Sequence, residues 1–233
     1  MNSLSIYFVL MFGWVTTACG VAPQGQSISD TSAPASGMAQ SRLGVFHNPM
    51  GWENQVEVHV HEDVPKQILP AVLEAIDVWN EAIGFNLVRF AGLSSTDRGT
   101  TLYASLGDES TILYYETSWE ATTGKSAMTL ATTIWENQSG GNGHIERGDI
   151  ILNGEYWAYA DAKEAGDEGG EPWLVDASTV IIHEIGHLLG LGHVDDEDDE
   201  SSVMSPYTKV GPGAWHRHLS SGDTHRIRTI YNP

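Results

Sequence analysis

Cysteine, basic residues and long apolar runs are all scarce in this chain of 233 residues. The one cysteine, Cys19, excludes a disulfide within the chain, so packing and bound metal must supply the stability of the fold. The chain has 11 Lys and Arg against 31 Asp and Glu, which gives a net charge of −20. Nucleic acid and anionic membrane surfaces are therefore disfavoured as partners, because phosphate binding needs the opposite charge. The length suits one folded domain with a leader, and we expect a monomer.

The beginning of the chain has the pattern of a targeting segment. Residues 4–15 are apolar but too few to span a membrane comfortably, and small residues lead from them to Cys19. This order resembles a bacterial lipoprotein signal, in which the cysteine is lipidated and becomes the first residue, although Thr16 stands where leucine is usual. Two alternatives stay open: ordinary cleavage near Ala18 or Ala22, and no processing. Lipidation or cleavage would export the protein, to a bacterial outer membrane or cell surface or to the extracellular medium.

The sequence therefore predicts three parts: a signal segment at residues 1–18, a flexible tether at residues 19–42 and one folded domain at residues 43–233. The tether is rich in Ser, Ala, Gly, Pro and Gln and has almost no large apolar residue. A short disordered propeptide would have the same composition. A lipid on Cys19 would be the only attachment of the chain to a membrane.

The most informative stretch is DASTVIIHEIGHLLGLGH, which begins at Asp176. Its apolar residues recur at helical spacing and predict an amphipathic helix, capped by Asp176 or Ser178 and ended by Gly190. His183 and His187 would lie one turn apart on the same face of this helix. Both imidazoles can therefore bind a single metal ion.

A turn at Gly190 can bring a third imidazole, that of His193, back toward the first two. Neutral imidazoles from His183, His187 and His193 leave the fourth position of a tetrahedral zinc site open to water, which is typical of a catalytic zinc. Glu184 follows His183 by about 100° of helical rotation, so its carboxylate is expected beside the ion and not on it. The sequence predicts one catalytic Zn²⁺, three histidine ligands and Glu184 as the catalytic residue.

The complete pattern, HExxHxxGxxH, is similar to that of the metzincin zinc peptidases, which also carry a methionine below the metal; Met204 in SVMSPY stands at a suitable distance. Other stretches resemble the matrixins, the matrix metalloproteinase-like group and its bacterial relatives. They are RGDIILNGEYW at residues 147–157, GHLLGLGH at the end of the zinc helix and LSSGDTHRIRTIY at residues 219–231. Val194 departs from this group, since typical matrixins have serine after the third histidine. The resemblance covers roughly residues 45–231, although only the zinc motif is highly specific.

The resemblance implies a zinc-dependent endopeptidase acting on protein or peptide substrates, in which Glu184 takes a proton from the zinc-activated water. It also implies that Met204 packs under the imidazoles and that Pro206 and Tyr207 wall the pocket for the side chain after the cleaved bond. Cys19 matches the zinc-capping cysteine of matrix metalloproteinase propeptides only faintly, because the flanking arginine and aspartate are absent. Two other functions stay open. A non-catalytic zinc-binding surface lipoprotein has no reason to keep Glu184, and a structural zinc protein needs a fourth protein ligand.

Periodicity and resemblance together predict an α+β metzincin catalytic domain. The spacing of large apolar residues predicts a long first helix over residues 65–83, ended by Gly84. Strands are expected at residues 55–61, 85–90, 101–106, 127–135 and 149–153. By resemblance they form a mixed twisted sheet, in which the strand at residues 127–135 is an antiparallel edge strand able to bind a peptide. Ser220 and Asp223 are expected to form a capping box at the start of a C-terminal helix.

Two further features carry alternatives. The acidic run DDEDDE at residues 195–200 is ordinarily solvated charge; Ca²⁺ binding is the alternative, but no spacing resembles an EF-hand, so no calcium ligand is assigned. His59 and His61 share the outer face of a predicted strand, where exposure to solvent is expected and a second, structural zinc site is the alternative.

Overall fold

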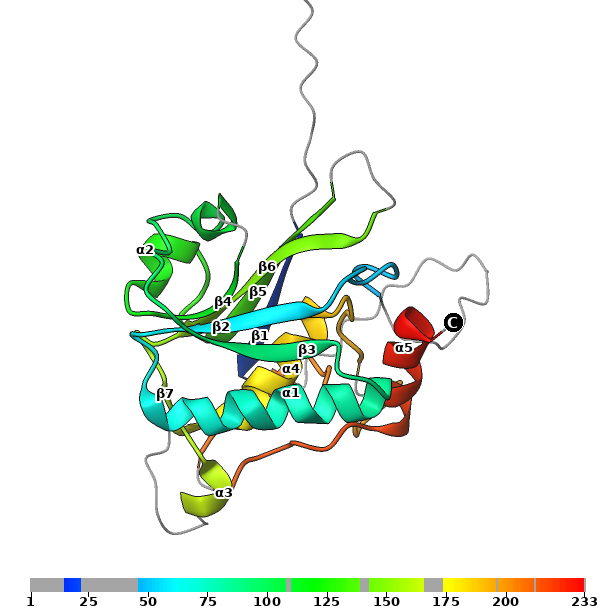
Figure 1. The fold of residues 1–233 in the computed structure, drawn as a ribbon. Coiled ribbons are helices and arrows are strands. Elements are labelled where there is room, and N and C mark those ends of the chain that lie inside the picture. Colours follow the sequence, from blue (N-terminus) through cyan, green and yellow to red (C-terminus); the bar gives the residue numbers. More distant parts are fainter. Residues whose placement is uncertain are drawn as a thin grey trace, which may run out of the picture.

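A mixed sheet forms the centre of the molecule (Figure 1). The computed structural model describes residues 15–21, 46–107, 110–138, 143–165, 174–195, 197–211 and 213–232. Within them the strand order is β3-β2-β4-β6-β5-β1-β9. The strands are β1 (Val15–Val21), β2 (Val56–His61), β3 (Val88–Ser94), β4 (Thr111–Glu116), β5 (Thr129–Asn137), β6 (Ile145–Asn153) and β9 (Tyr207–Thr208). Neighbours from β3 to β6 are parallel, whereas β5 is antiparallel to both β6 and β1, and β9 is parallel to β1.

The other elements surround this sheet. The helices are α1 (Leu69–Ile83), α2 (Trp119–Thr123), α3 (Ala162–Ala165), α4 (Ala177–Leu188) and α5 (Ser221–Tyr231), and the short strands β7 (Ala158–Ala160) and β8 (Leu174–Asp176) pair in parallel. Among the described residues, no helix has the length and apolar character that crossing a membrane requires. This arrangement matches the predicted α+β class with a mixed sheet, a long first helix, a zinc-site helix and a C-terminal helix.

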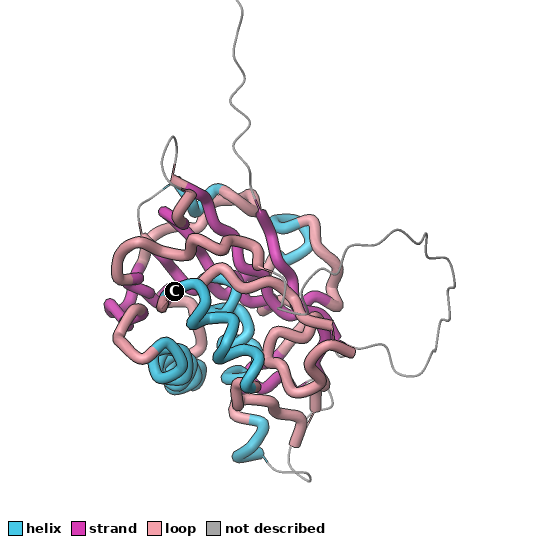
Figure 2. Tube along the Cα trace, turned by 90° about the vertical axis from the view of Figure 1, so that its right-hand side faces the viewer, coloured by secondary structure: helices cyan, strands magenta, loops and turns pink. Residues whose placement is uncertain are grey.

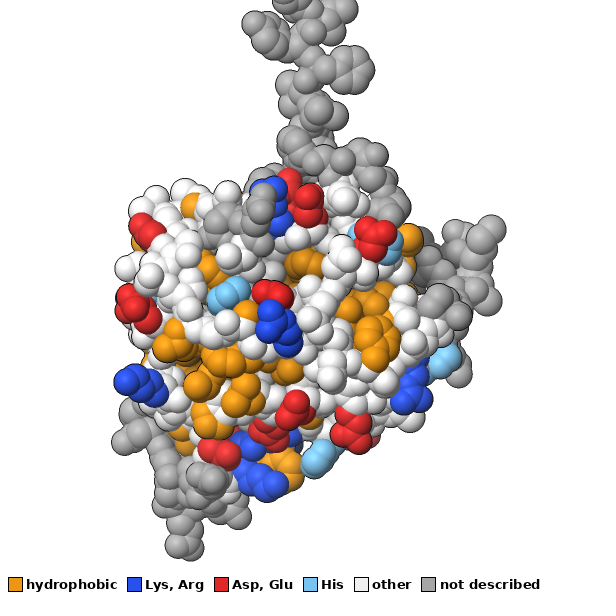
Figure 3. Space-filling view, viewed as in Figure 1, with side chains coloured by type: hydrophobic (Ala, Val, Ile, Leu, Met, Phe, Trp, Pro, Cys, Tyr) orange, Lys and Arg blue, Asp and Glu red, His pale blue; other side chains and the backbone are white. Residues whose placement is uncertain are grey.

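The sheet separates two apolar cores. On one face α1 and α4 pack against the sheet, and α2 lies on the other side; Figure 2 shows the layers from a second direction. Side chains of a strand alternate between the two faces, so Leu113 of β4 belongs to the larger core while Ile112 and Tyr114 belong to the smaller one. The face seen in Figure 3 carries scattered acidic side chains around a group of hydrophobic ones, so the net charge of −20 is not concentrated there.

The predicted first helix is confirmed. Pro70 lies in its first turn, where the missing N–H has no partner to lose, and Gly84 ends it with a φ of 95°. The helix is joined to the zinc-site helix by the fully buried Trp79, whose indole N–H donates to the Ile182 carbonyl over 2.8 Å. Helix α1 therefore holds α4 in place through this buried contact.

One predicted strand was wrong. Residues 101–106 form a turn and a 3₁₀ helix, Ala104–Gly107, and the strand is β4 (Thr111–Glu116) instead. Four successive residues of β4, from Thr111 to Tyr114, are buried because this parallel strand lies between β2 and β6 and is covered on both faces. Such a strand shows a continuous apolar run without the period of two that marks a half-exposed strand.

The sheet also extends further than predicted. Residues 15–21 were placed outside the fold, as parts of the signal segment and the tether, but they form β1 along β5. Strand β5 is therefore not the edge in this structure, and the peptide-binding edge predicted for it is paired with the chain itself. The remaining residues of the predicted signal and tether lie outside the described residues, and the processing of the leader stays a prediction.

A buried ion cluster holds the start of α4. Arg217 is 7% exposed and its guanidinium contacts three carboxylates: Asp176 at 2.6 Å, Asp161 at 2.6 Å and Glu74 at 3.3 Å. The hydrogen bond to Asp176 is the largest of the effects that raise the pKa of Arg217. Because Asp176 also caps α4, this cluster ties the helix start to α1 and to the loop before α3.

Candidate active site

The zinc-site helix α4 is buried on every side. Asp176 caps its start by accepting a hydrogen bond from the Thr179 amide over 3.0 Å, and the chain turns at Gly190, where φ is 101°. The sequence predicted an amphipathic helix, but each residue of α4 is buried, since the sheet, α1 and the segment around residue 203 enclose it. The packing around α4 is tight, as protein interiors generally are. A Cβ atom added at Gly186 would lie 2.4 Å from Met204 Sδ, which is too close for a real contact.

The structure brings the three predicted histidines together. One ring nitrogen from each of His183, His187 and His193 lies within 4.8 Å of the others. His183 Nδ1 donates to the Val203 carbonyl over 2.7 Å, and His187 Nδ1 donates to the Leu191 carbonyl over 2.9 Å. These bonds fix the tautomer of both rings and leave each Nε2 with a free lone pair.

The free nitrogens fit a zinc ion. His183 Nε2 is buried without a hydrogen-bond partner among the described residues, and the Nε2 atoms of His187 and His193 are 3.1 Å apart. Burial lowers the pKa of His183 to about 3 and that of His193 to about 4, and it lowers the pKa of His187 well below its usual range. The three imidazoles are therefore neutral at physiological pH, as metal binding requires.

Glu184 is fully buried beside this group. Its Oε2 accepts a hydrogen bond of 2.6 Å from the Thr133 hydroxyl of β5, and its Oε1 has no partner among the described residues. Burial raises the pKa of Glu184 to about 8, while the bond from Thr133 and the charge of Lys125 oppose that rise. At this pKa the carboxyl is mostly protonated at neutral pH in the metal-free protein, and the positive charge of a bound metal would favour the ionised form, which can accept a proton.

Three residues near the site were not found from the sequence. Thr133 orients Glu184, Lys125 places a positive charge near it, and the His47 ring lies edge-on to His187 with centroids 5.6 Å apart. The segment at His47 is held by two amides that donate to the Gly190 carbonyl. No motif links these residues to the zinc helix, because each lies far from it in sequence and only the tertiary fold brings them close.

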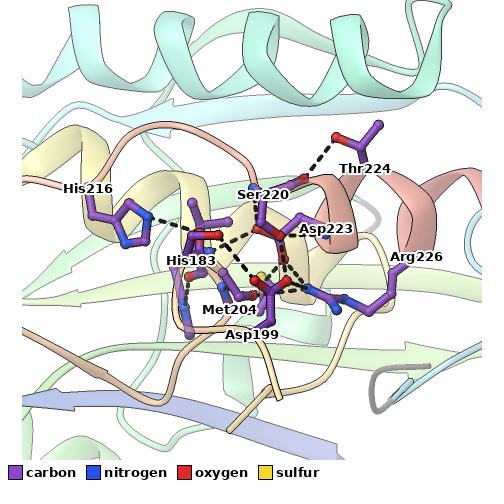
Figure 4. A network of polar contacts seen from close by, with 11 residues as sticks. His183, Asp199, Met204, His216, Ser220, Asp223, Thr224 and Arg226 are labelled. Atoms are coloured by element: carbon purple, nitrogen blue, oxygen red, sulfur yellow. Dashed lines mark hydrogen bonds and ion pairs between the residues drawn. The ribbon is translucent and has the colours of Figure 1, made fainter. Parts of the chain in front are cut away.

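A polar network supports the turn that carries Met204 (Figure 4). Asp223, at the start of α5, accepts hydrogen bonds from Ser202 Oγ over 2.6 Å, from the Val203 amide over 2.9 Å and from the Ser220 amide over 3.0 Å. The predicted capping box of Ser220 and Asp223 is present. Since the carbonyl of Val203 holds His183, only one residue separates Asp223 from an imidazole of the predicted metal site.

One member of the acidic run takes part in this network. Asp199 accepts hydrogen bonds from Ser220 Oγ over 2.6 Å and from Arg226 over 3.2 Å, whereas the run was expected to be solvated charge. Arg226 has only 6% of its side chain exposed and also contacts Asp223. The run therefore contributes a structural carboxylate that its composition did not distinguish from its neighbours.

Among the described residues, the other histidines belong to no second group of three or more converging candidate ligands. Within the described part of the chain, the zinc triad is the one group of at least three His, Cys, Asp or Glu side chains whose ligand atoms converge. His61 lies against the Tyr114 ring, with centroids 5.4 Å apart, and His59 is partly buried, so neither is the freely exposed side chain expected.

Tyr207 is 57% exposed at the outer rim of the site.

Comparisons with known proteins found several similar proteins and one matching family model. Metalloendoproteinase 1-MMP of Arabidopsis thaliana is 38% identical over 66 residues, which are 28% of this chain and 17% of that protein. Metalloproteinase-II from Bacteroides fragilis shares 14% identity and a TM-score of 0.43 over 80% of this chain and 58% of its own. High choriolytic enzyme 1, a hatching enzyme zinc-protease from Oryzias latipes, shares 12% identity and a TM-score of 0.37 over 78% of this chain and 94% of its own. The matrixin family model matches residues 58–232, and this chain therefore belongs to the matrixin family of zinc metalloproteases.

Proposed function

We propose that this protein is an exported zinc-dependent endopeptidase that hydrolyses protein or peptide substrates with Glu184 as general base. One observation carries the proposal: three imidazole nitrogens converge with no fourth protein ligand among the residues that the structure describes, and Glu184 lies beside them with Oε1 unbonded to any of those residues. A structural zinc site would fill its fourth position with a protein atom. A non-catalytic binding protein would have no use for a buried carboxylate at this position.

Each residue of the site has a separate role in the proposed reaction. The three histidines would hold Zn²⁺, which would supply a Lewis acid able to lower the pKa of water toward neutrality and to polarise a carbonyl. Glu184 accepts the proton of the attacking water and passes it to the leaving amine. Thr133 keeps Oε2 in place, so that Oε1 is the atom that exchanges the proton. Lys125 favours the ionised form of Glu184.

The sheet offers a place for the substrate. Strand β1 lies antiparallel to β5 and parallel to β9, with Thr17 paired to Thr133 and Gly20 paired to Tyr207. An extended peptide in the same position would run past Glu184 and would use the backbone groups that now bind β1. A substrate must therefore displace residues 15–21, or these residues must be removed during export, before cleavage can begin.

Weakening β1 is expected to increase activity. Thr17→Pro and Ala18→Pro each remove one N–H, and because successive N–H groups of a strand point in opposite directions, one of the two variants removes a bond to β5. The loss of one ladder bond, about 0.5–1.5 kcal/mol, should raise the initial cleavage rate of the full chain about threefold to tenfold. Thr17→Val, which favours a strand, is the matched control. Equal initial rates for wild type and both proline variants would contradict a role of β1 in covering the cleft.

Removing the metal is expected to abolish activity. We expect the full chain, wild type or Thr17→Pro, to cleave casein at internal bonds, to stop in the presence of a zinc chelator and to recover when one equivalent of zinc is returned. Mass spectrometry of the products distinguishes internal cleavage from trimming at the ends. Stoichiometric zinc without cleavage of any peptide in a diverse library would support the zinc-binding surface lipoprotein instead.

Export and partners form the rest of the proposal. The protein acts on polypeptides outside the cytoplasm as a monomer, and a lipid on Cys19 would attach it to a membrane. The net charge of −20 supports protein partners over nucleic acid. Mass spectrometry of the exported protein tests this part, because it gives the first residue and the mass of any lipid. An unprocessed chain retained inside the cell would contradict it.

A further inference from the structure

A small pocket lies next to the first zinc-binding histidine. Its volume is about 20 Å³, and α4 lines it with His183, Val180 and Thr179. The turn at Ser202, the strand β9 and His216 close the other sides. Because β9 pairs with the strand in the cleft, a bound peptide would pass over the rim of this pocket with one side chain directed into it.

The volume limits what can enter. A water molecule needs roughly 10–15 Å³ of such space, so about 20 Å³ holds about one water-sized group, a methyl or a hydroxyl. The polar groups of the wall already have partners: Ser202 Oγ donates to Asp223, and Thr179 Oγ1 donates to Asp176 and accepts from the His216 amide. A substrate side chain therefore does not need to satisfy them, and size decides what binds.

His216 forms the wall that makes the pocket small. Its amide donates to Thr179 Oγ1 over 2.7 Å, and its Nε2 lies 3.1 Å from the Ser201 carbonyl, so the backbone and the ring are held separately. Figure 4 shows the His216 ring with a dashed line for its contact with the Ser201 carbonyl. On the other side of His216 lies a hollow of about 420 Å³, whose lining includes Trp215, 39% exposed.

The same group of residues separates the small pocket from the larger hollow. Five residues line both of them, namely Ser202, Ser205, Tyr207, Thr208 and His216. Of these, His216 has the largest side chain that is not mostly exposed, since Tyr207 points outward. Removing the ring would join the two spaces without breaking the bond from the His216 amide, which belongs to the backbone.

We propose that His216 determines substrate specificity: it restricts the position after the cleaved bond to side chains of the size of alanine or serine. This inference rests on the proposed peptidase function. A leucine at that position carries three more carbon atoms than alanine and cannot enter unless the partition moves. With the ring removed, the hollow beside Trp215 provides space for a larger side chain.

The test uses the full chain, wild type and Thr17→Pro, with a peptide library varied at the position after the cleaved bond. We expect kcat/KM for alanine and serine to exceed that for leucine at least tenfold, because even one methylene in such a pocket changes kcat/KM about 10–200-fold. His216→Ala should raise kcat/KM for leucine about tenfold or more relative to kcat/KM for alanine. His216→Gln keeps the volume and a donor toward the Ser201 carbonyl, so it should keep the preference for small side chains.

The outcomes separate the inference from the proposed function. Cleavage by wild type with a preference for leucine or phenylalanine overturns the inference and leaves the peptidase proposal standing. An unchanged preference in His216→Ala, with zinc content and alanine turnover retained, overturns the role of His216. Should His216→Ala fail to fold, the wild-type library profile decides on the small pocket, and His216→Asn, whose side chain is shorter than the ring, decides on the residue by whether it admits leucine. Absence of cleavage of every peptide overturns the proposed function itself.

Discussion

Replacing Glu184 with glutamine is expected to lower kcat about 10²–10⁴-fold while the protein keeps one zinc per chain. Glutamine has the shape of glutamate, and its amide oxygen can still accept the hydrogen bond that Thr133 now donates to Oε2. It cannot take a proton from water at neutral pH. Because the three histidines are the proposed metal ligands and Glu184 does not belong to the converging group, zinc content should be unchanged. The measurement is casein cleavage together with zinc analysis of the same samples.

A second variant separates the base from its support. Thr133→Val removes the hydroxyl that orients Glu184 and keeps a β-branched residue in β5, so we expect a smaller loss of kcat, about tenfold, with zinc retained. The ordering of the two losses is the informative result. Glu184→Gln with wild-type turnover, or with lost zinc, would mean that the carboxylate is a metal ligand or a structural group and not the base.

The zinc helix and the first helix were predictable because their signals are local. A period of apolar residues, a proline in the first turn and Gly84 at the end define α1 without reference to the rest of the molecule. The capping box of Ser220 and Asp223 likewise needs only residues three apart. The spacing of His183 and His187 is a property of one helix, and Gly190 allows the turn that brings His193 back.

The features that the sequence did not predict depend on pairing between distant segments. The continuous apolar run of β4 has no period, so residues 101–106 were preferred although they lie in a turn. The placement of β1 along β5 follows from backbone hydrogen bonds that any extended segment can make, and its small residues gave no sign of a partner. Asp199 could not be told from the other acids of its run, because Arg226 selects it through the fold.

Asp223→Ala is expected to damage both stability and metal binding. The fully buried carboxylate binds Ser202 Oγ and the amides of Val203 and Ser220, and alanine would leave these three donors without it. Each buried donor that loses its partner costs about 1–3 kcal/mol, so we expect the free energy of unfolding to fall by about 3–5 kcal/mol in urea denaturation. The Val203 carbonyl would lose its fixed position, and with it the hydrogen bond that orients His183. Loss of such an outer partner typically weakens metal binding 10–100-fold.

Loss of zinc in Asp223→Ala could come from the lost support of His183 or from general destabilisation of the fold, and a control variant separates the two causes. Arg226→Met is the matched control, because Arg226 also pairs with Asp223 and Asp199 but makes no bond to Val203. It should lower the free energy of unfolding, since it leaves buried carboxylates without their cation, yet the zinc dissociation constant should rise less than threefold. If zinc affinity followed stability equally in both variants, general loosening of the fold would explain the metal loss. A zinc dissociation constant within twofold of wild type in Asp223→Ala would show that the Val203 carbonyl holds His183 without help from α5.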